Sequence, residues 1–284
     1  MGLRIGLIAA RSKDEAIELA EEIHPWLEDA GCIVVLEDQL LAGEPADILL
    51  AIGGDGLIMR VAHTVPDIPI LGINLGKVGF LARIERRDWQ SALAEVIGGR
   101  YNLEESPTLA ADLVRAGAIT GVGWAINDVV IRCGMQMIDV EVYLDGQFVN
   151  TYPGDGMIVS TPQGSTAYCM AAGGPVLAAG VHGFALVPIC AHSPIRTTLV
   201  APEEALIELV VPAERPADLI LDGVPEIALQ AGDLVQVRRG EHHFRLVVLK
   251  GMNFYQAFRS KFNFMIRPNA VPTRVARVAE PASD

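Results

Sequence analysis

The feature that most constrains the fold is an apolar run at residues 48–52 that leads into Gly53-Gly54-Asp55-Gly56. A short apolar run that ends in glycines is typical of a buried parallel strand followed by a tight turn. Apolar side chains then recur at helical spacing over residues 57–62, so a helix is predicted directly after the turn. The free N–H groups and partial positive charge of a helix N-terminus make this unit a candidate phosphate-binding turn.

Asp55 is the unexpected residue in this turn, because a carboxylate repels phosphate. Its presence would be explained if the side chain activates a hydroxyl group, holds a metal ion, or does both. The simpler interpretation is a turn or helix-cap aspartate, which needs no ligand. From the motif alone these interpretations stay open.

The first third of the chain alternates strand and helix patterns. Strands are predicted at residues 3–9, 33–36, 48–52 and 69–73, and helices at 12–30 and 88–97. Ser12 and Glu15 match a capping box at the start of the first helix. This alternation predicts an N-terminal α/β, Rossmann-like domain with a parallel sheet. Ligands in such sheets bind at the carboxyl ends of strands, where residues 53–56 and 74–79 both fall.

After residue 99 the pattern changes to short β-like segments, one of them at residues 125–131, separated by turn residues. These predict a mostly-β, β-sandwich-like C-terminal domain, whose best helix signal covers about residues 165–172. We therefore expect an α/β domain at residues 1–106 carrying the glycine turn, a β-rich domain at 107–267 and a loose tail at 268–284. Whether the last part of the β-rich domain packs back on the first domain is left open.

Composition excludes several classes of partner. The net charge of −13 argues against broad attraction to nucleic acid or to an anionic membrane. No apolar run is long enough to span a bilayer, and no signal peptide is recognised. The cysteines lack metal-ligand spacing and are expected to be reduced thiols, in keeping with a cytoplasmic protein. Because no GxxxxGK[ST] motif is present, a phosphate site would need backbone amides, a few basic side chains or a cation.

Two further stretches concentrate polar residues. Asn127-Asp128 interrupts an apolar segment, and buried polar groups must be paired, either in an internal network or with a ligand; we favour the ligand. Residues 154–168 combine Asp155, a Pro/Gly loop and a helix opened by Ser165 or Thr166. Small hydroxyl residues at a helix start can bind the edge of a base or a sugar, and a carboxylate can accept hydrogen bonds from ribose hydroxyls. The alternative is ordinary turn and cap chemistry.

Four motifs therefore occur in a fixed order: Gly53-Gly54-Asp55-Gly56, Asn74-Leu-Gly-x-x-Gly-Phe80, Asn127-Asp128, and the stretch from Asp155 to Tyr168. Together they resemble the bacterial NAD kinases of the ATP-NAD kinase family, although GGDG alone is shared with diacylglycerol and sphingosine kinases. The resemblance implies transfer of the γ-phosphate of ATP to the adenosine 2′-hydroxyl of NAD, giving NADP. It also implies a divalent metal cation such as Mg²⁺, a dinucleotide-binding C-terminal domain, and a homodimer or homotetramer.

Matched position by position, the resemblance makes Asp55 the proton acceptor that activates the 2′-hydroxyl. It assigns no side chain as a metal ligand. Tyr168 is expected to reach the ligand of a neighbouring subunit, and Phe80 to supply an apolar wall. The other matched positions contact the nucleotides: Gly56 and Arg60 near the phosphates and ribose, Asn127 and Asp128 at the adenosine, Asp155 on the nicotinamide-riboside side, and Thr166, Ala167 and Tyr168 at the adenine.

Some positions depart from the family pattern. Asp128 stands where a glutamate is usual, and Gln163 where a threonine is usual. Ala171, at a position that contacts adenine, lacks the hydroxyl of the usual serine, and Val224 occupies a site where a polar residue is frequent. These changes bear on affinity and on donor preference rather than on the type of reaction.

Two other functions are compatible with parts of the pattern. A lipid kinase of the diacylglycerol kinase type would share the GGDG turn, but the acidic net charge and the run at residues 160–168 argue against it. A non-catalytic dinucleotide-binding sensor would fit better if Asp55 were missing. A lipid kinase would phosphorylate lipid in vesicles, whereas a sensor would bind dinucleotide without consuming ATP.

Overall fold

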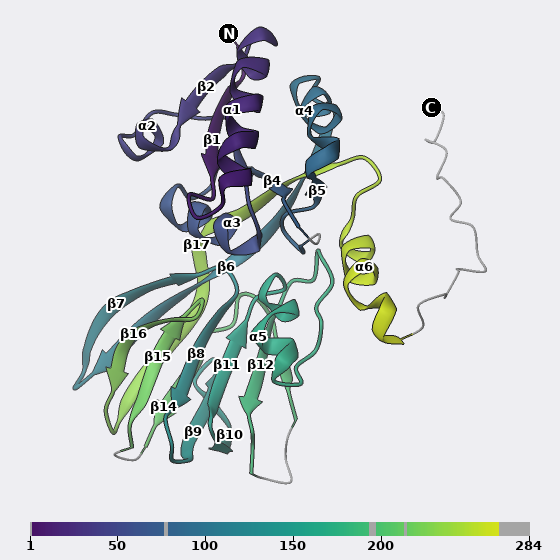
Figure 1. Cartoon of the computed structure of the whole chain (residues 1–284). Coiled ribbons are helices and arrows are strands. Elements are labelled where there is room, and N and C mark those ends of the chain that lie inside the picture. Colours follow the sequence, from purple (N-terminus) through teal and green to yellow (C-terminus); the bar gives the residue numbers. More distant parts are fainter. Residues whose placement is uncertain (1, 77–78, 193–196, 213–214, 267–284) are drawn as a thin grey trace, which may run out of the picture.

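The computed structural model describes residues 2–76, 79–192, 197–212 and 215–266, without the side chains of residues 260 and 262–266 (Figure 1). The loose tail predicted at residues 268–284 lies outside the described residues, as do Lys77 and Val78 of the 74–79 segment. Among the described residues, no helix is both long enough and apolar enough to cross a membrane.

The N-terminal part contains the predicted parallel sheet, which lies between two layers of helices. Its strands pair in the order β4-β3-β1-β2, and buried aliphatic side chains fill both interfaces. Helices α1 and α4 cover one face, and α2 and α3 cover the other. The elements are β1 (Arg4–Ala9), α1 (Asp14–Asp29), β2 (Ile33–Leu36), α2 (Glu37–Leu41), β3 (Ile48–Ile52), α3 (Asp55–Thr64), β4 (Ile70–Asn74), β5 (Ile84–Glu85), η1 (Arg86–Asp88) and α4 (Trp89–Ile97).

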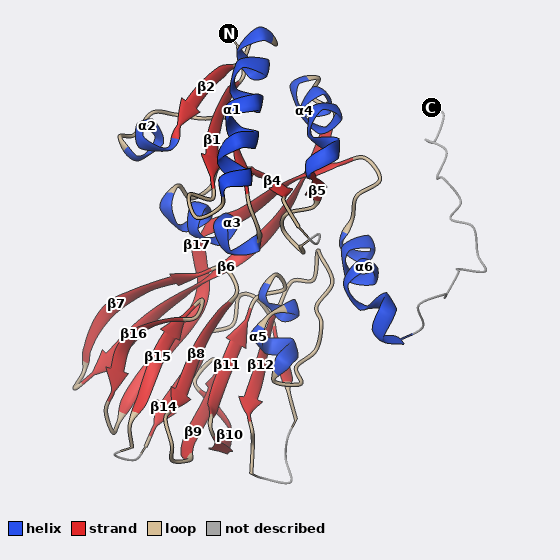
Figure 2. Ribbon diagram, in the orientation of Figure 1, coloured by secondary structure: helices blue, strands red, loops and turns tan. Residues whose placement is uncertain are grey.

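The C-terminal part is dominated by strands, which Figure 2 shows in red. Alternating apolar residues from two sheets form one buried core between them. The elements are β6 (Tyr101–Arg115), β7 (Ala118–Ala125), β8 (Asp128–Cys133), β9 (Ile138–Leu144), β10 (Gln147–Gly154), β11 (Gly156–Ser160), η2 (Gly164–Thr166), α5 (Tyr168–Ala171), β12 (Phe184–Ile189), β13 (Leu199–Ala201), β14 (Ile207–Val211), β15 (Ala217–Leu221), β16 (Val224–Leu229), β17 (Asp233–Leu249) and α6 (Phe254–Ile266).

Two long strands join the parts. Strand β17 pairs with β6 along most of its length and also pairs in parallel with β4, where Leu246 lies opposite Ile70. One sheet therefore runs from the parallel strands into the β-rich part, while the other has the order β13-β12-β11-β8-β15-β16. The predicted fold class, an α/β part followed by a mostly-β part, is confirmed. The division at residues 106 and 107 falls within β6 and stays a prediction.

Several local predictions were wrong. The strand predicted at 125–131 is broken, because β7 ends at Ala125 and β8 begins at Asp128. The capping box at the first helix does not form: the N-cap is Lys13, without a side-chain cap hydrogen bond. The helix predicted at 165–172 is a 3-10 turn followed by the short α5. Helices α2 and α6 were not predicted from the sequence.

Candidate active site

Asp55 is the first residue of α3, directly after the turn that follows β3, but its side chain does not cap its own helix. Instead its carboxylate accepts hydrogen bonds from the backbone N–H groups of Phe80, Leu81 and Ala82, at 3.0, 3.2 and 3.1 Å. Gly79 permits this approach, since a Cβ atom there would lie 1.9 Å from Oδ1 of Asp55. The side chain keeps 33% of its surface exposed, so the three N–H groups fix the carboxylate while part of it stays accessible.

Asn127 and Asp128 lie at the break between β7 and β8, and this break is held by the carboxylate of Asp222. Oδ1 of Asp222 accepts hydrogen bonds from the N–H groups of Asn127 and Asp128, and Oδ2 accepts one from the N–H of Ile126. Nε2 of His63, on α3, lies 2.7 Å from the same Oδ2. The backbone amides of residues 126–128 are thus bonded to a carboxylate, which fixes the bend that carries Asn127 and Asp128.

Sequence reasoning missed both Asp222 and His63. Asp222 has a positive φ of 48° and is followed by Gly223 at 82°, in the turn between β15 and β16. That Asp-Gly pair is an ordinary hairpin signal. Its partners are about a hundred residues away or more in the sequence, so the signal could locate the turn but not its role.

Asp128 is a buried carboxyl group, with 4% of its surface exposed. Burial, and secondly the negative charge of Asp222, raise its pKa to about 7. Its β8 position is opposite Ser160 of β11. Asp128 therefore exists in both protonation states near neutral pH and can either donate or accept a hydrogen bond.

The loop after β11 packs directly on the Asn127-Asp128 bend. The Thr161 hydroxyl donates to the carbonyl oxygen of Ile126 at 2.6 Å, and the Thr161 N–H donates to that of Asn127 at 2.9 Å. Gly164 is close enough that a Cβ atom would lie 2.1 Å from the Asn127 carbonyl oxygen. The structure therefore brings together two motifs that the sequence analysis singled out separately.

Thr166 connects this loop to the region of Asp55. It lines a narrow crevice with Gln163 and with Phe80, whose N–H donates to Asp55. Ala167, between η2 and α5, is exposed. The Asp55 turn, the Asn127-Asp128 bend and the 160–168 loop thus form one continuous region.

A pocket of about 840 Å³ opens beside this region, within the size range of small-molecule sites. Its lining includes Asp155, Tyr168 and Ala171, three of the positions that the sequence analysis assigned to nucleotide binding. The side-chain hydrogen bond and the charge of Asp155 raise the pKa of the neighbouring Cys190 thiol. Lining residues that the sequence did not indicate include Arg132, Cys190, His192 and Thr198; the Arg132 guanidinium lies 5.9 Å from the centre of the Tyr168 ring.

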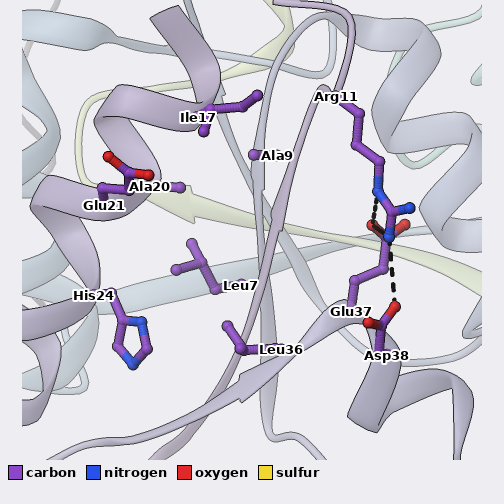
Figure 3. A pocket seen from close by; sticks show the side chains of 10 residues that line it. All are labelled: Leu7, Ala9, Arg11, Ile17, Ala20, Glu21, His24, Leu36, Glu37 and Asp38. Carbon is purple, nitrogen blue, oxygen red and sulfur yellow. Dashed lines mark hydrogen bonds and ion pairs between the residues drawn. The ribbon is translucent and has the colours of Figure 1, made fainter. Parts of the chain in front are cut away.

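Gly56 and Arg60 are on α3, and the side chain of Arg60 is paired with a carboxylate. Its guanidinium lies 2.7 Å from Oε1 of Glu37. Figure 3 shows Glu37 beside a second pocket, of about 290 Å³, where Arg11 also pairs with Glu37 and Asp38. Burial raises the pKa of Glu37, but hydrogen bonds and charge from Arg60 and Arg11 hold it below its ordinary value. Arg60 therefore belongs to an ion-pair network at the surface.

A metal centre built by the protein is not found in the part of the chain that the structure describes. Among those residues, no group of three or more His, Cys, Asp or Glu side chains is placed to hold an ion. The buried cysteines Cys32, Cys133 and Cys169 and the exposed Cys190 are free thiols.

Comparisons with known proteins agree with this arrangement. The family model of the ATP-NAD kinase N-terminal domain matches residues 39–101, and that of the C-terminal domain matches residues 126–249. The chain is 61% identical to an NAD kinase of Thermomicrobium roseum, covering 100% of this chain and 99% of that protein. It is 33% identical to an NAD kinase of Alcanivorax borkumensis, covering 93% and 95%.

Solved structures resemble the whole fold. An Archaeoglobus fulgidus NAD kinase in complex with ATP superposes with a TM-score of 0.73 at 26% identity, covering 91% of this chain and 98% of that one. A yeast NADH kinase complexed with NADH superposes with a TM-score of 0.80, covering 97% and 91%; at 20% identity this second likeness bears on the fold alone.

Proposed function

The chain belongs to the ATP-NAD kinase family and makes NADP by transferring the γ-phosphate of ATP to the adenosine 2′-hydroxyl of NAD, and we propose that Asp55 is the general base of this transfer. The family membership removes the lipid kinase from consideration. It also favours an active enzyme over a silent sensor, since Asp55 is present.

The observation that carries the proposal is how Asp55 is held. The N–H groups of Phe80, Leu81 and Ala82 fix the carboxylate, and a third of the side chain stays open to an incoming ligand. A ribose hydroxyl is a poor nucleophile at neutral pH, and a positioned base accelerates such reactions by roughly 10²–10⁴-fold. Asp55 takes the 2′-hydroxyl proton while the ribose oxygen bonds to the γ-phosphorus; the bond from that phosphorus to the bridging oxygen breaks, and ADP leaves.

The acceptor NAD binds across the 126–128 bend and the larger pocket. Asn127 and Asp128 bind the adenosine, and Thr166, Ala167 and Tyr168 surround the adenine. Asp155 binds the nicotinamide-riboside side, in the pocket that it lines with Ala171. The bend supports this assignment, because Asp222 holds its backbone independently of any ligand and so preorganises the two side chains.

The donor ATP binds at the start of α3, where the N–H of Gly56 belongs to the first turn and so has no i−4 partner within the helix. A contact from Arg60 to ATP would require it to leave Glu37. A divalent cation, Mg²⁺ by its preference for phosphate oxygens, would enter with ATP, because the described residues include no cluster that could hold it. Such a cation would neutralise charge on the transferring phosphoryl group.

We also propose a homodimer or homotetramer, in the cytoplasm, where Tyr168 reaches the ligand of a neighbouring subunit. This proposal is supported by the partial exposure of Tyr168, which lines the large pocket. Sedimentation of the purified protein tests the oligomer, and a monomer at micromolar concentration would contradict it.

The catalytic proposal is tested by Asp55→Asn in a steady-state assay that couples NADP formation to a dehydrogenase. Turnover should fall by about 10²–10⁴-fold while the KM for NAD changes little. Asp29→Asn is the matched control, since Asp29 is an exposed aspartate at the end of α1. Equal turnover in the wild type and Asp55→Asn would exclude the general-base role.

A further inference from the structure

A lysine from the C-terminal helix stands in front of the proposed base. Nζ of Lys261, on α6, lies 3.9 Å from Oδ2 of Asp55 and 4.8 Å from the centre of the Phe80 ring. Phe254, the first residue of α6, lines the narrow crevice with Phe80 and Thr166. Two residues of α6 therefore lie beside Asp55, Phe80 and Thr166. This helix is the last described element of the chain (Figure 1).

The contacts of Lys261 with the described residues include no hydrogen bond from its ammonium group. The distance to Asp55 is longer than a hydrogen bond, and the contact with Phe80 is a cation–π interaction. An ammonium group has three N–H donors, and none has a hydrogen-bond acceptor among the described residues. The Lys261 side chain is 39% exposed and that of Asp55 is 33% exposed, so both charged groups are accessible to a ligand.

Other cations nearby are already paired with carboxylates. Arg60, five residues after Asp55, lies 2.7 Å from Glu37. Arg83, next to the 79–82 segment, lies 2.7 Å from Glu104 and is only 9% exposed. Among the described basic side chains of α3 and of residues 79–83, each arginine therefore has a close anionic partner. Lys261 differs in that its partner is the proposed base itself.

A positive charge near Asp55 would favour binding of the donor substrate. ATP brings a triphosphate into a chain of net charge −13 that has no Walker lysine, and Asp55 adds a further negative charge beside it. A positive charge that lies beside the transferring phosphoryl group stabilises the transition state strongly.

We propose that Lys261 binds the γ-phosphate of ATP and stays on that group during transfer, an inference that rests on the proposed role of Asp55. Before ATP enters, the ammonium pairs loosely with Asp55; when ATP binds, it moves to a γ-phosphate oxygen and leaves the carboxylate free to meet the ribose hydroxyl. Lys261 acts through its charge and its hydrogen bonds, and it forms and breaks no covalent bond. A helix at the C-terminal end thereby supplies the phosphate-binding lysine that the glycine turn lacks.

The test compares the binding of ATP and of ADP by calorimetry in Lys261→Met, Lys261→Gln and Lys261→Arg. All are made in the Asp55→Asn background, so that ATP is not consumed when NAD is present. Relative to Asp55→Asn alone, we expect Lys261→Met and Lys261→Gln to weaken ATP binding by about 10- to 100-fold. ADP binding should weaken by less than about twofold. Lys261→Arg should retain part of the affinity. Arg259→Met, at an exposed position on the same helix, is the control and should change neither affinity.

In the enzyme that retains Asp55, Lys261→Met should also lower kcat by about 10²–10³-fold with little change in the KM for NAD. Unchanged ATP affinity in the Asp55→Asn background would show that Lys261 serves only to balance Asp55 and would overturn the inference. Equal losses for ATP and ADP would do so too, because they would place the lysine away from the γ-phosphate. A failure of Asp55 as base would be seen separately, as retained turnover in Asp55→Asn.

Discussion

Nε2 of His63 lies 2.7 Å from Oδ2 of Asp222, so the helix that begins with Asp55 is tied near its other end to the carboxylate that holds the Asn127-Asp128 bend. The ring of His63 also packs on Trp124, and Trp124 packs on His242. His242 in turn lies 2.7 Å from Asp67. The proposed catalytic and adenosine-binding elements are therefore positioned relative to each other by one side-chain network.

The first prediction concerns Asp222. In Asp222→Asn an N–H₂ group replaces one carboxylate oxygen and faces backbone donors, so at least one buried N–H loses its acceptor. We expect a loss of about 1–3 kcal/mol in the free energy of unfolding in urea, and a larger rise in the KM for NAD than in the KM for ATP. Asp218→Asn, at an exposed position on β15, is the control. Unchanged stability and an unchanged KM for NAD would contradict the role of Asp222.

The second prediction concerns the space behind Asp55. In Gly79→Ala the new methyl group would meet Oδ1 of Asp55 at 1.9 Å, so the carboxylate must shift. A displacement of about 1 Å costs about 100-fold in rate when geometry controls the reaction, and we expect kcat to fall by that order. Gly134→Ala, where a Cβ atom meets nothing within 4 Å, should be silent. Full activity in Gly79→Ala would show that the position of Asp55 is not critical.

The third prediction follows from the pKa of Asp128, which is raised from 3.8 to about 7 by burial and by Asp222. Between these values the unfolded chain has lost the proton and the folded chain keeps it, so this group's contribution to stability falls as pH rises from about 4 to about 7. Asp128→Asn removes the effect. Its stability relative to the wild type should increase over that range, by up to about 4 kcal/mol, and then level off. A difference that does not change between pH 4 and pH 8 in urea unfolding would contradict the raised pKa.

The fourth prediction concerns the adenosine site. Asp128→Ala removes a proposed ligand of NAD but no proposed ligand of ATP, so the KM for NAD should rise more than the affinity for ATP changes. Asp128→Glu restores the side chain that is usual in the family and tests whether reach matters. If the KM for NAD is unchanged in Asp128→Ala, Asp128 does not belong to the acceptor site.

Local patterns were sufficient to predict the scaffold of the site. The structure has the expected strand at residues 48–52, the glycine turn and the start of α3 at Asp55. Apolar spacing and glycines predict these elements because they determine backbone conformation over a few neighbouring residues. The same reasoning failed at the bend before Asp128. The apolar residues on both sides indicated one continuous strand, but Asp222 accepts the backbone N–H groups of residues 126–128 and ends the strand pairing there.

Residues that act through long-range contacts could not be predicted. Nothing near Asp222 or His63 in the sequence indicates that they meet across 159 positions. Lys261 is different, because a signal existed: Phe254, Ala257 and Phe258 recur at helical spacing and predict a helix, of which Ala257 is buried. The sequence still could not have shown that this helix would point its lysine at Asp55.

The measurement that tests the central claim most directly is the rate of the chemical step in Asp55→Asn. With enzyme in excess over NAD, and with saturating ATP and Mg²⁺, a single turnover separates phosphoryl transfer from binding and product release. If Asp55 accepts the 2′-hydroxyl proton, NADP should form about 10²–10⁴-fold more slowly than in the wild type, while calorimetry gives an unchanged affinity for NAD. NADP formation at the wild-type rate in this variant would show that another group, or no group, takes the proton.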